Sequence, residues 1–125
     1  MDIENNEQYV NYFDASILDY KEGTAYFEEK LPEVTKAYMK FTEHCFEPGK
    51  LNQKEKQLIA LGISVYAQDE YCIMYHTKGA VEHGATEEEI AETIGVCAAL
   101  GGGAAFAQGV TLAMETYHHY ANEAH

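Results

Sequence analysis

The amino-acid sequence predicts an all-α protein, with residues 1–125 forming a single domain of about six helices. Apolar residues recur at intervals of three and four almost throughout, which is the period of an amphipathic helix. No segment shows the alternation of apolar and polar residues that marks a half-buried strand. Proline, glycine and N-capping residues divide the periodic pattern into segments of helical length.

Two helices are expected before the break at Pro48-Gly49. The first should stop near Gly23, and the second should begin at Pro32, because proline suits the first turn of a helix. Their apolar stripes consist of Tyr9, Phe13, Ile17 and Tyr20 in the first helix, and Val34, Tyr38, Phe41 and Cys45 in the second. Residues 1–47 are thus expected to form a helical extension in front of the rest of the domain.

Asn52 and Glu55 form a capping-box pattern that opens a third helix, roughly Gln53 to Gln68. This segment is apolar on most sides, so we expect it to be the central buried helix. Asp69 is a good N-cap for a fourth helix, which should end at Gly84.

Thr86 and Glu89 form the clearest capping box in the chain and should open a fifth helix. Its apolar face carries Ile90, Ile94 and Cys97. Three consecutive glycines, 101–103, either interrupt the helix or allow close packing at this junction. A last helix should follow, with an apolar stripe of Phe106, Val110, Ala113, Tyr117 and Tyr120.

The charge balance argues against several partners. There are 21 acidic residues against 8 lysines, no arginine, and a net charge of −13. Nucleic acids and anionic membrane surfaces require basic patches, so neither is an expected partner. Bidentate clamping of a carboxylate or phosphate by arginine is excluded. An acidic N-terminus unlike a secretory signal, and three scattered cysteines without a CxxC pair, favour a cytoplasmic location.

Cys72 and His76 are the most informative pair of residues. On a helix, positions i and i+4 lie on one face, so the sulfur and the imidazole ring can meet. A thiol is nucleophilic as the thiolate, which the helix N-terminus and a nearby imidazole favour, while the surrounding acidic residues oppose it. The alternative is an inert thiol and a core histidine bonded to a backbone carbonyl. Cys45 and Cys97 lie on apolar stripes and are expected to react slowly.

The region from Pro48 to Tyr117 resembles the carboxymuconolactone decarboxylase and alkylhydroperoxidase D-like proteins. The resemblance rests on the order and spacing of several motifs. These are PGKL at 48–51, KQLIAL at 56–61, YCxxxH at 71–76, GATEEEI at 84–90 and the small-residue run 98–105. It implies an all-α fold and, commonly, assembly as trimers or as hexamers built from trimers.

Two positions depart from the pattern of the family's antioxidant branch, which has a glutamate, a CxxC pair and a histidine. The second cysteine and the histidine correspond to Cys72 and His76, whereas the first cysteine falls on Asp69 and the glutamate on Gln57. Loss of the first cysteine removes the intramolecular disulfide of dithiol turnover. The decarboxylase branch keeps the glutamate, so Gln57 departs from that template as well.

The candidate catalytic residues are therefore Cys72, His76, Asp69, Gln57 and Tyr71. Asp69 is either a helix cap, a proton relay or both, and Gln57 is more readily a neutral hydrogen-bond partner than a catalyst. Tyrosines such as Tyr71 usually pack their ring against other side chains and leave the hydroxyl in contact with solvent. No metal or other cofactor is expected. Asp69, Cys72, His76 and His83 lie on one helical stripe, but one straight helix cannot bring four such ligands to one ion.

Three functions are compatible with these residues. The leading hypothesis is a thiol-dependent antioxidant enzyme that reduces a peroxide or exchanges with a small thiol through Cys72, with an external thiol as resolving partner. A second is a lyase acting on a small lactone or keto acid, with His76 and Asp69 as acid and base. A third is a binding subunit that has the family's fold but no catalytic activity. Apolar helices and the small-residue run also predict a homo-oligomer.

Overall fold

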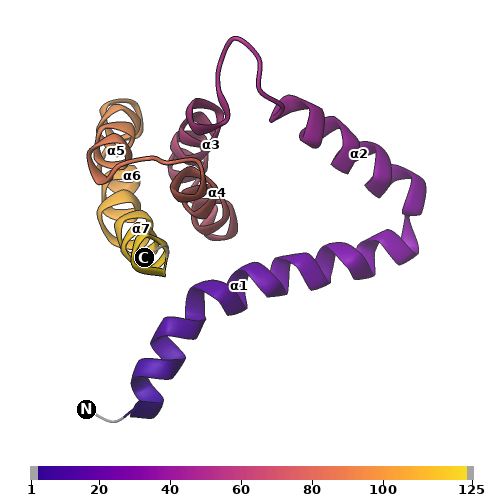
Figure 1. The fold of residues 1–125 in the computed structure, drawn as a ribbon, viewed down its shortest axis with the longest axis horizontal. Coiled ribbons are helices and arrows are strands. Elements are labelled where there is room, and N and C mark those ends of the chain that lie inside the picture. The colour runs from indigo at the N-terminus through magenta and orange to yellow at the C-terminus, as the bar shows by residue number, and fades with distance from the viewer. Residues whose placement is uncertain (1–2, 124–125) are drawn as a thin grey trace. The chain divides into compact units, whose positions relative to one another are not determined.

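The computed structural model describes residues 3–123, with side chains from Tyr12 onward, and within that range it contains helices and no strand (Figure 1). This confirms the all-α prediction. The helices are α1 (Ile3–Lys30), α2 (Pro32–Cys45), α3 (Gln53–Ala67), α4 (Glu70–Glu82), α5 (Glu87–Gly101), α6 (Gly103–Gln108), the π-helical segment η1 (Gly109–Ala113) and α7 (Met114–Glu123). The last three form one continuous helical run. Among the described residues, none of these helices has the length and apolar character needed to cross a bilayer.

The chain divides into two compact units, Met1–Gly49 and Lys50–His125. The first unit contains α1 and α2. The prediction that the first helix stops near Gly23 was wrong, because α1 continues to Lys30. One glycine inside a helix costs only about 1 kcal/mol, which the rest of a long helix offsets. The break comes instead at Leu31, whose non-helical backbone is what a following proline favours, and Pro32 opens α2 as expected.

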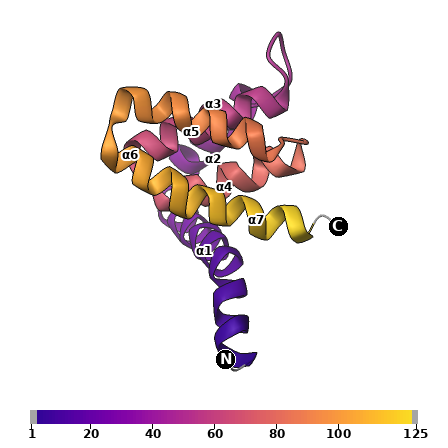
Figure 2. The ribbon, with the colours of Figure 1, turned by 90° about the vertical axis from the view of Figure 1, so that its left-hand side faces the viewer.

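The second unit consists of two layers, α3 with α4, and α5 with the α6–η1–α7 run, which lie side by side in Figure 1 and one behind the other in Figure 2. Their facing sides form an apolar core that includes Leu61, Val65, Ile73, Ile90 and Ile94. Helix α3 packs on both α4 and α5, so it is central as expected. It is not buried on all sides, however, because Ile59, Ile63 and Tyr66 are 51–65% exposed.

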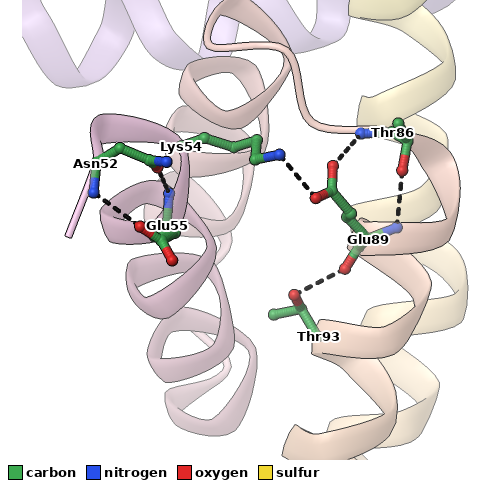
Figure 3. Close-up of polar contacts among 6 residues, drawn as sticks. All are labelled: Asn52, Lys54, Glu55, Thr86, Glu89 and Thr93. Carbon is green, nitrogen blue, oxygen red and sulfur yellow. Dashed lines mark hydrogen bonds and ion pairs between the residues drawn. The ribbon is translucent and has the colours of Figure 1, made fainter.

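Polar caps fix the beginnings of α3 and α5 relative to each other (Figure 3). Both predicted capping boxes form, Asn52 with Glu55 and Thr86 with Glu89. Lys54 Nζ on α3 lies 2.8 Å from Glu89 Oε2 on α5. The hydrogen bond from Lys54, followed by that from the Thr86 backbone, lowers the pKa of the Glu89 carboxyl. One carboxylate therefore both caps α5 and joins it to α3.

The small-residue junction allows the last helical run to pack closely on α5. Gly102 has φ 75°, a left-handed value that glycine adopts readily. A Cβ at Gly109 would lie 2.4 Å from Ile94 Cγ2, so only glycine permits this approach. The predicted stripe of the last helix was wrong at its start, since Phe106 and Val110 are exposed and Ala105 and Gly109 are buried instead. The wider π turn of η1 shifts the register, and the stripe is correct again at Ala113 and Tyr120.

Candidate functional site

Asp69 positions the beginning of α4. Its carboxylate Oδ1 accepts a hydrogen bond from the Cys72 backbone N–H at 3.2 Å, which confirms the predicted N-cap. The chain reverses just before it, where Gln68 takes a left-handed φ of 56° and the Asp69 N–H donates to the Ser64 carbonyl oxygen at 3.0 Å. The result is a tight connection that brings the first turn of α4 alongside the end of α3.

The Cys72 thiol is half-buried in this first turn, and its pKa is raised to about 11. Burial is the largest cause, followed by the hydrogen bond from the thiol to Asp69 and the negative charge of that carboxylate. These effects exceed the thiolate stabilisation that a helix N-terminus offers. Cys72 is therefore a protonated thiol at neutral pH, in the same helical turn as the Asp69 carboxylate.

The His76 ring connects α4 to α3. Its Nδ1–H donates to Gln57 Oε1 at 2.9 Å, so Nε2 is the nitrogen able to accept a proton. Burial lowers the pKa of His76, and the charge of Asp69 opposes this shift. The imidazole is thus neutral at neutral pH.

Gly79 provides the space that Gln57 occupies. It lies on α4 three residues after His76, and it is buried. A Cβ built at Gly79 would lie 2.6 Å from both Cδ and Oε1 of Gln57, so a larger residue here requires the Gln57 side chain to move. The sequence analysis missed this residue, although a glycine inside a helix, one turn from a candidate histidine, is a signal of close packing.

The structure thus joins four of the five predicted site residues in two hydrogen-bonded pairs, Asp69 with Cys72 and Gln57 with His76. Cys72 and His76 share a face of α4, and the charge of Asp69 acts on the pKa of both. The fifth residue, Tyr71, follows the cap with its side chain 43% exposed.

The stripe of possible zinc ligands does not assemble along α4. Asp69 is the N-cap of the helix, whereas His83 is its C-cap at the opposite end. These two residues are separated by the full length of α4, so Asp69, Cys72, His76 and His83 cannot surround one ion within a chain.

The other two cysteines differ from each other. Cys97 is buried, its thiol donates to the Gly62 carbonyl oxygen at 3.3 Å, and burial raises its pKa. Cys45 was expected to be protected on an apolar stripe, but it is exposed. Alkylating reagents therefore reach Cys45 directly, and experiments on Cys72 require a Cys45→Ser background.

Comparison with known proteins agrees with this arrangement of helices. Residues 32–115, two thirds of the chain, match the sequence model described as the carboxymuconolactone decarboxylase family. The chain belongs to this family. The match includes α2 as well as the whole site, so it begins earlier than the region singled out from the sequence.

Two curated relatives and two solved structures are similar to this family member. An uncharacterized protein of the cox locus of Paracoccus denitrificans is 41% identical over 57% of this chain and 64% of its own length. An uncharacterized protein of Methanocaldococcus jannaschii is 32% identical over 74% of the chain and 90% of its own length.

The crystal structure of a carboxymuconolactone decarboxylase family protein from Legionella pneumophila aligns with a TM-score of 0.84 and 28% identity, covering 89% of this chain and 98% of that one. A family protein from Thermotoga maritima, described as possibly involved in antioxidative response, aligns with a TM-score of 0.62 and 26% identity, covering 81% and 95%.

The capping and electrostatic roles of Asp69 can be separated by two substitutions. Asp69→Ala removes the cap, and we expect it to lower the free energy of unfolding by about 1 kcal/mol. Asp69→Asn retains an equally good cap without the charge, so its stability should stay within a few tenths of a kcal/mol of the wild type. Urea denaturation followed by circular dichroism measures both. An equal loss in the two variants would show that capping is not what Asp69 contributes to stability.

Gly79→Ala is expected to displace Gln57 from His76. Water then reaches the ring, and the pKa of His76, followed by NMR, should rise toward its ordinary value. The free energy of unfolding should fall by about 1–3 kcal/mol, because the added methyl overpacks the contact between α3 and α4.

Gly95→Ala is the matched control for this substitution. Gly95 is also a helical glycine, but a Cβ there has nothing within 4 Å. This variant should gain up to about 1 kcal/mol from helix propensity. The packing described for Gly79 is wrong if Gly79→Ala changes the free energy of unfolding no more than Gly95→Ala does. It is also wrong if Gly79→Ala lowers that free energy by the same amount when Gln57 has already been replaced by alanine.

Proposed function

We propose that this protein is a thiol-dependent peroxide reductase that uses Cys72 as its only redox cysteine. The observation that carries the proposal is the placement of the Asp69 carboxylate at the first turn of α4, where it accepts the Cys72 backbone N–H at 3.2 Å and acts on the Cys72 thiol, on the same helix face as a neutral His76. The antioxidative response suggested for the Thermotoga maritima protein supports the same class of reaction. With Asp69 in place of a second cysteine, the reaction needs an external thiol.

The first step forms a sulfur–oxygen bond. The Cys72 sulfur attacks the terminal oxygen of a hydroperoxide, the O–O bond breaks, and the products are a cysteine sulfenic acid and an alcohol. Asp69 accepts the thiol proton as the S–O bond forms, and this proton ends on the leaving alkoxide oxygen. His76 Nε2 accepts a hydrogen bond from the hydroperoxide O–H and orients it.

Two molecules of external thiol complete the cycle. The first attacks the sulfenic acid, which releases water and leaves a mixed disulfide on Cys72. The second attacks this disulfide, which restores the Cys72 thiol and releases the oxidised reductant. The raised pKa of Cys72 makes the resting thiol slow with general electrophiles, so the base at Asp69 is needed for turnover.

A second candidate is a lyase that moves a proton on a small lactone or keto acid. The directions of the two pKa shifts favour it, because they leave Cys72 protonated and His76 neutral, as a proton acceptor must be. The absence of arginine disfavours it, since such substrates carry carboxylates.

The decisive assay measures consumption of an organic hydroperoxide with a dithiol reductant in a Cys45→Ser background. Cys72→Ser should abolish turnover, and His76→Gln should slow it by about 10² or more. Cys97→Ser is the control and should retain activity. Mass spectrometry with a sulfenic acid trap should place the oxidation on Cys72.

Two results would contradict the proposal. One is catalytic turnover that persists in Cys72→Ser. The other is turnover of a small lactone or keto acid that is lost in His76→Gln and unaffected by Cys72→Ser, which would establish the lyase instead.

A further inference from the structure

An apolar groove runs between α3 and α5 in the second unit. Its volume of about 460 Å³ lies within the range of roughly 300–1,000 Å³ that is typical of small-molecule sites. The lining extends from Leu58 to Tyr66 along α3 and from Thr93 to Leu100 along α5. Tyr66 follows Gln57 by roughly two and a half helical turns. The groove therefore lies on the side of α3 opposite the Gln57 side chain and is separate from the candidate site.

The polar side chains of the α5 wall are already paired within the protein. Thr93 Oγ1 donates to the Glu89 carbonyl oxygen at 2.8 Å, and the Cys97 thiol donates across the groove floor to the Gly62 carbonyl oxygen at 3.3 Å. Among the residues that the structure describes, none with a charged side chain lines the groove. A polar group buried here would lose its hydrogen bonds to water without replacement, so the body of an occupant has to be apolar.

Gly62 keeps the groove open near its centre. It lies inside α3 with an ordinary helical backbone, and a Cβ there would meet only Thr93 Cγ2, at an ordinary contact distance of 3.6 Å. Neither the backbone nor close packing therefore requires a glycine at this position, although glycine is among the poorest helix formers. What the missing side chain provides is space between α3 and α5.

The size of the groove favours a small molecule over a protein partner. Nine residues line it, whereas each side of a stable protein interface takes about 20–30 residues. From Leu58 to Tyr66 the axis of α3 advances roughly 12 Å. An extended chain of single bonds advances about 1.2 Å per bond, so this length corresponds to about ten carbon atoms.

Charge around the groove selects the polar end of such a molecule. Four glutamates lie within the first two turns of α5, at the Thr93 end of the groove, and the nearby Lys54 is paired with one of them, Glu89. The whole chain has a net charge of −13, so an anionic head group is repelled. An uncharged hydroxyl needs only to reach water at the open rim, where Ile63 is 65% and Leu100 82% exposed.

We propose that the groove between α3 and α5 binds an uncharged molecule with a single aliphatic chain of up to about ten carbons, of the class of a medium-chain alcohol. Each methylene that enters the groove should lower the Kd about fourfold, until the chain outgrows the groove. Binding there does not involve Cys72, so Cys72→Ser should bind the alcohol as the wild type does. The result is thus independent of whether the protein reduces peroxides.

Methyl NMR titration of the full chain with 1-hexanol, 1-octanol, 1-decanol and 1-dodecanol measures both the affinity and the location. The methyl signals of Ile63, Val96 and Leu100 should shift, whereas those of Leu51, an exposed leucine outside the groove, should not. The Kd should fall about tenfold or more at each step up to 1-decanol and little further with 1-dodecanol. Decanoate should bind at least about tenfold more weakly than 1-decanol.

Gly62→Leu should fill the groove with its own side chain and abolish the shifts, without loss of helix content, because a Cβ fits there. Gly95→Leu is the matched control, since Gly95 is a helical glycine outside the groove with nothing within 4 Å of its Cβ position. It should bind 1-decanol with the wild-type Kd. Unshifted groove methyls at saturating 1-decanol, a Kd independent of chain length, decanoate binding as tight as that of 1-decanol, or unchanged binding in Gly62→Leu would each overturn the proposal.

A protein surface in the groove would give a different result. The wild type would then fail to bind 1-decanol, and Ile63→Asp would lower the mass measured by light scattering on a size-exclusion column. That outcome also overturns the proposal, whereas the small-molecule site predicts that Ile63→Asp weakens 1-decanol binding and leaves the mass unchanged.

Discussion

The Asp69 carboxylate at the start of α4 is the group on which the site depends. It satisfies a backbone N–H that the helix would otherwise leave unpaired, and it contributes to the raised pKa of the Cys72 thiol. Its negative charge acts on Cys72 and His76 in the same direction, because it favours the protonated form of each. For His76 burial outweighs that charge, so the neutral imidazole lies beside a protonated thiol. This combination suits proton transfer during the reaction rather than a preformed thiolate.

The site is held rigid by the contact between α3 and α4. Gln57 reaches His76 through the space left by Gly79, and the tight turn at Gln68 keeps the two helices together. At the other side of α3, Lys54 and Glu89 fix the start of α5. Helix α3 thus supports the site through its contacts with both α4 and α5.

The sequence predicted where helices begin, because capping residues and proline have a strong preference for the first turn of a helix. Asn52, Asp69, Thr86 and Pro32 all begin helices as expected. Prediction failed where packing between distant segments decides the result. Gly23 did not end α1, and the π turn of η1 shifted the last stripe. In the site, the Cys72–His76 spacing placed both residues on one face, but it could not show that burial and the Asp69 carboxylate shift their pKa values or that Gln57 on α3 is bonded to His76.

The pH dependence of Cys72 alkylation, measured in a Cys45→Ser background, tests most directly whether Asp69 keeps this thiol protonated. In the wild type the rate should rise about tenfold per pH unit, toward a pKa of about 11. Asp69→Asn keeps the helix cap and removes the charge, so the curve should move to lower pH and alkylation at pH 8 should be faster. Glu70→Gln, which removes a neighbouring charge, is the control and should leave the curve nearly unchanged. Superimposable curves for the wild type and Asp69→Asn would contradict the account.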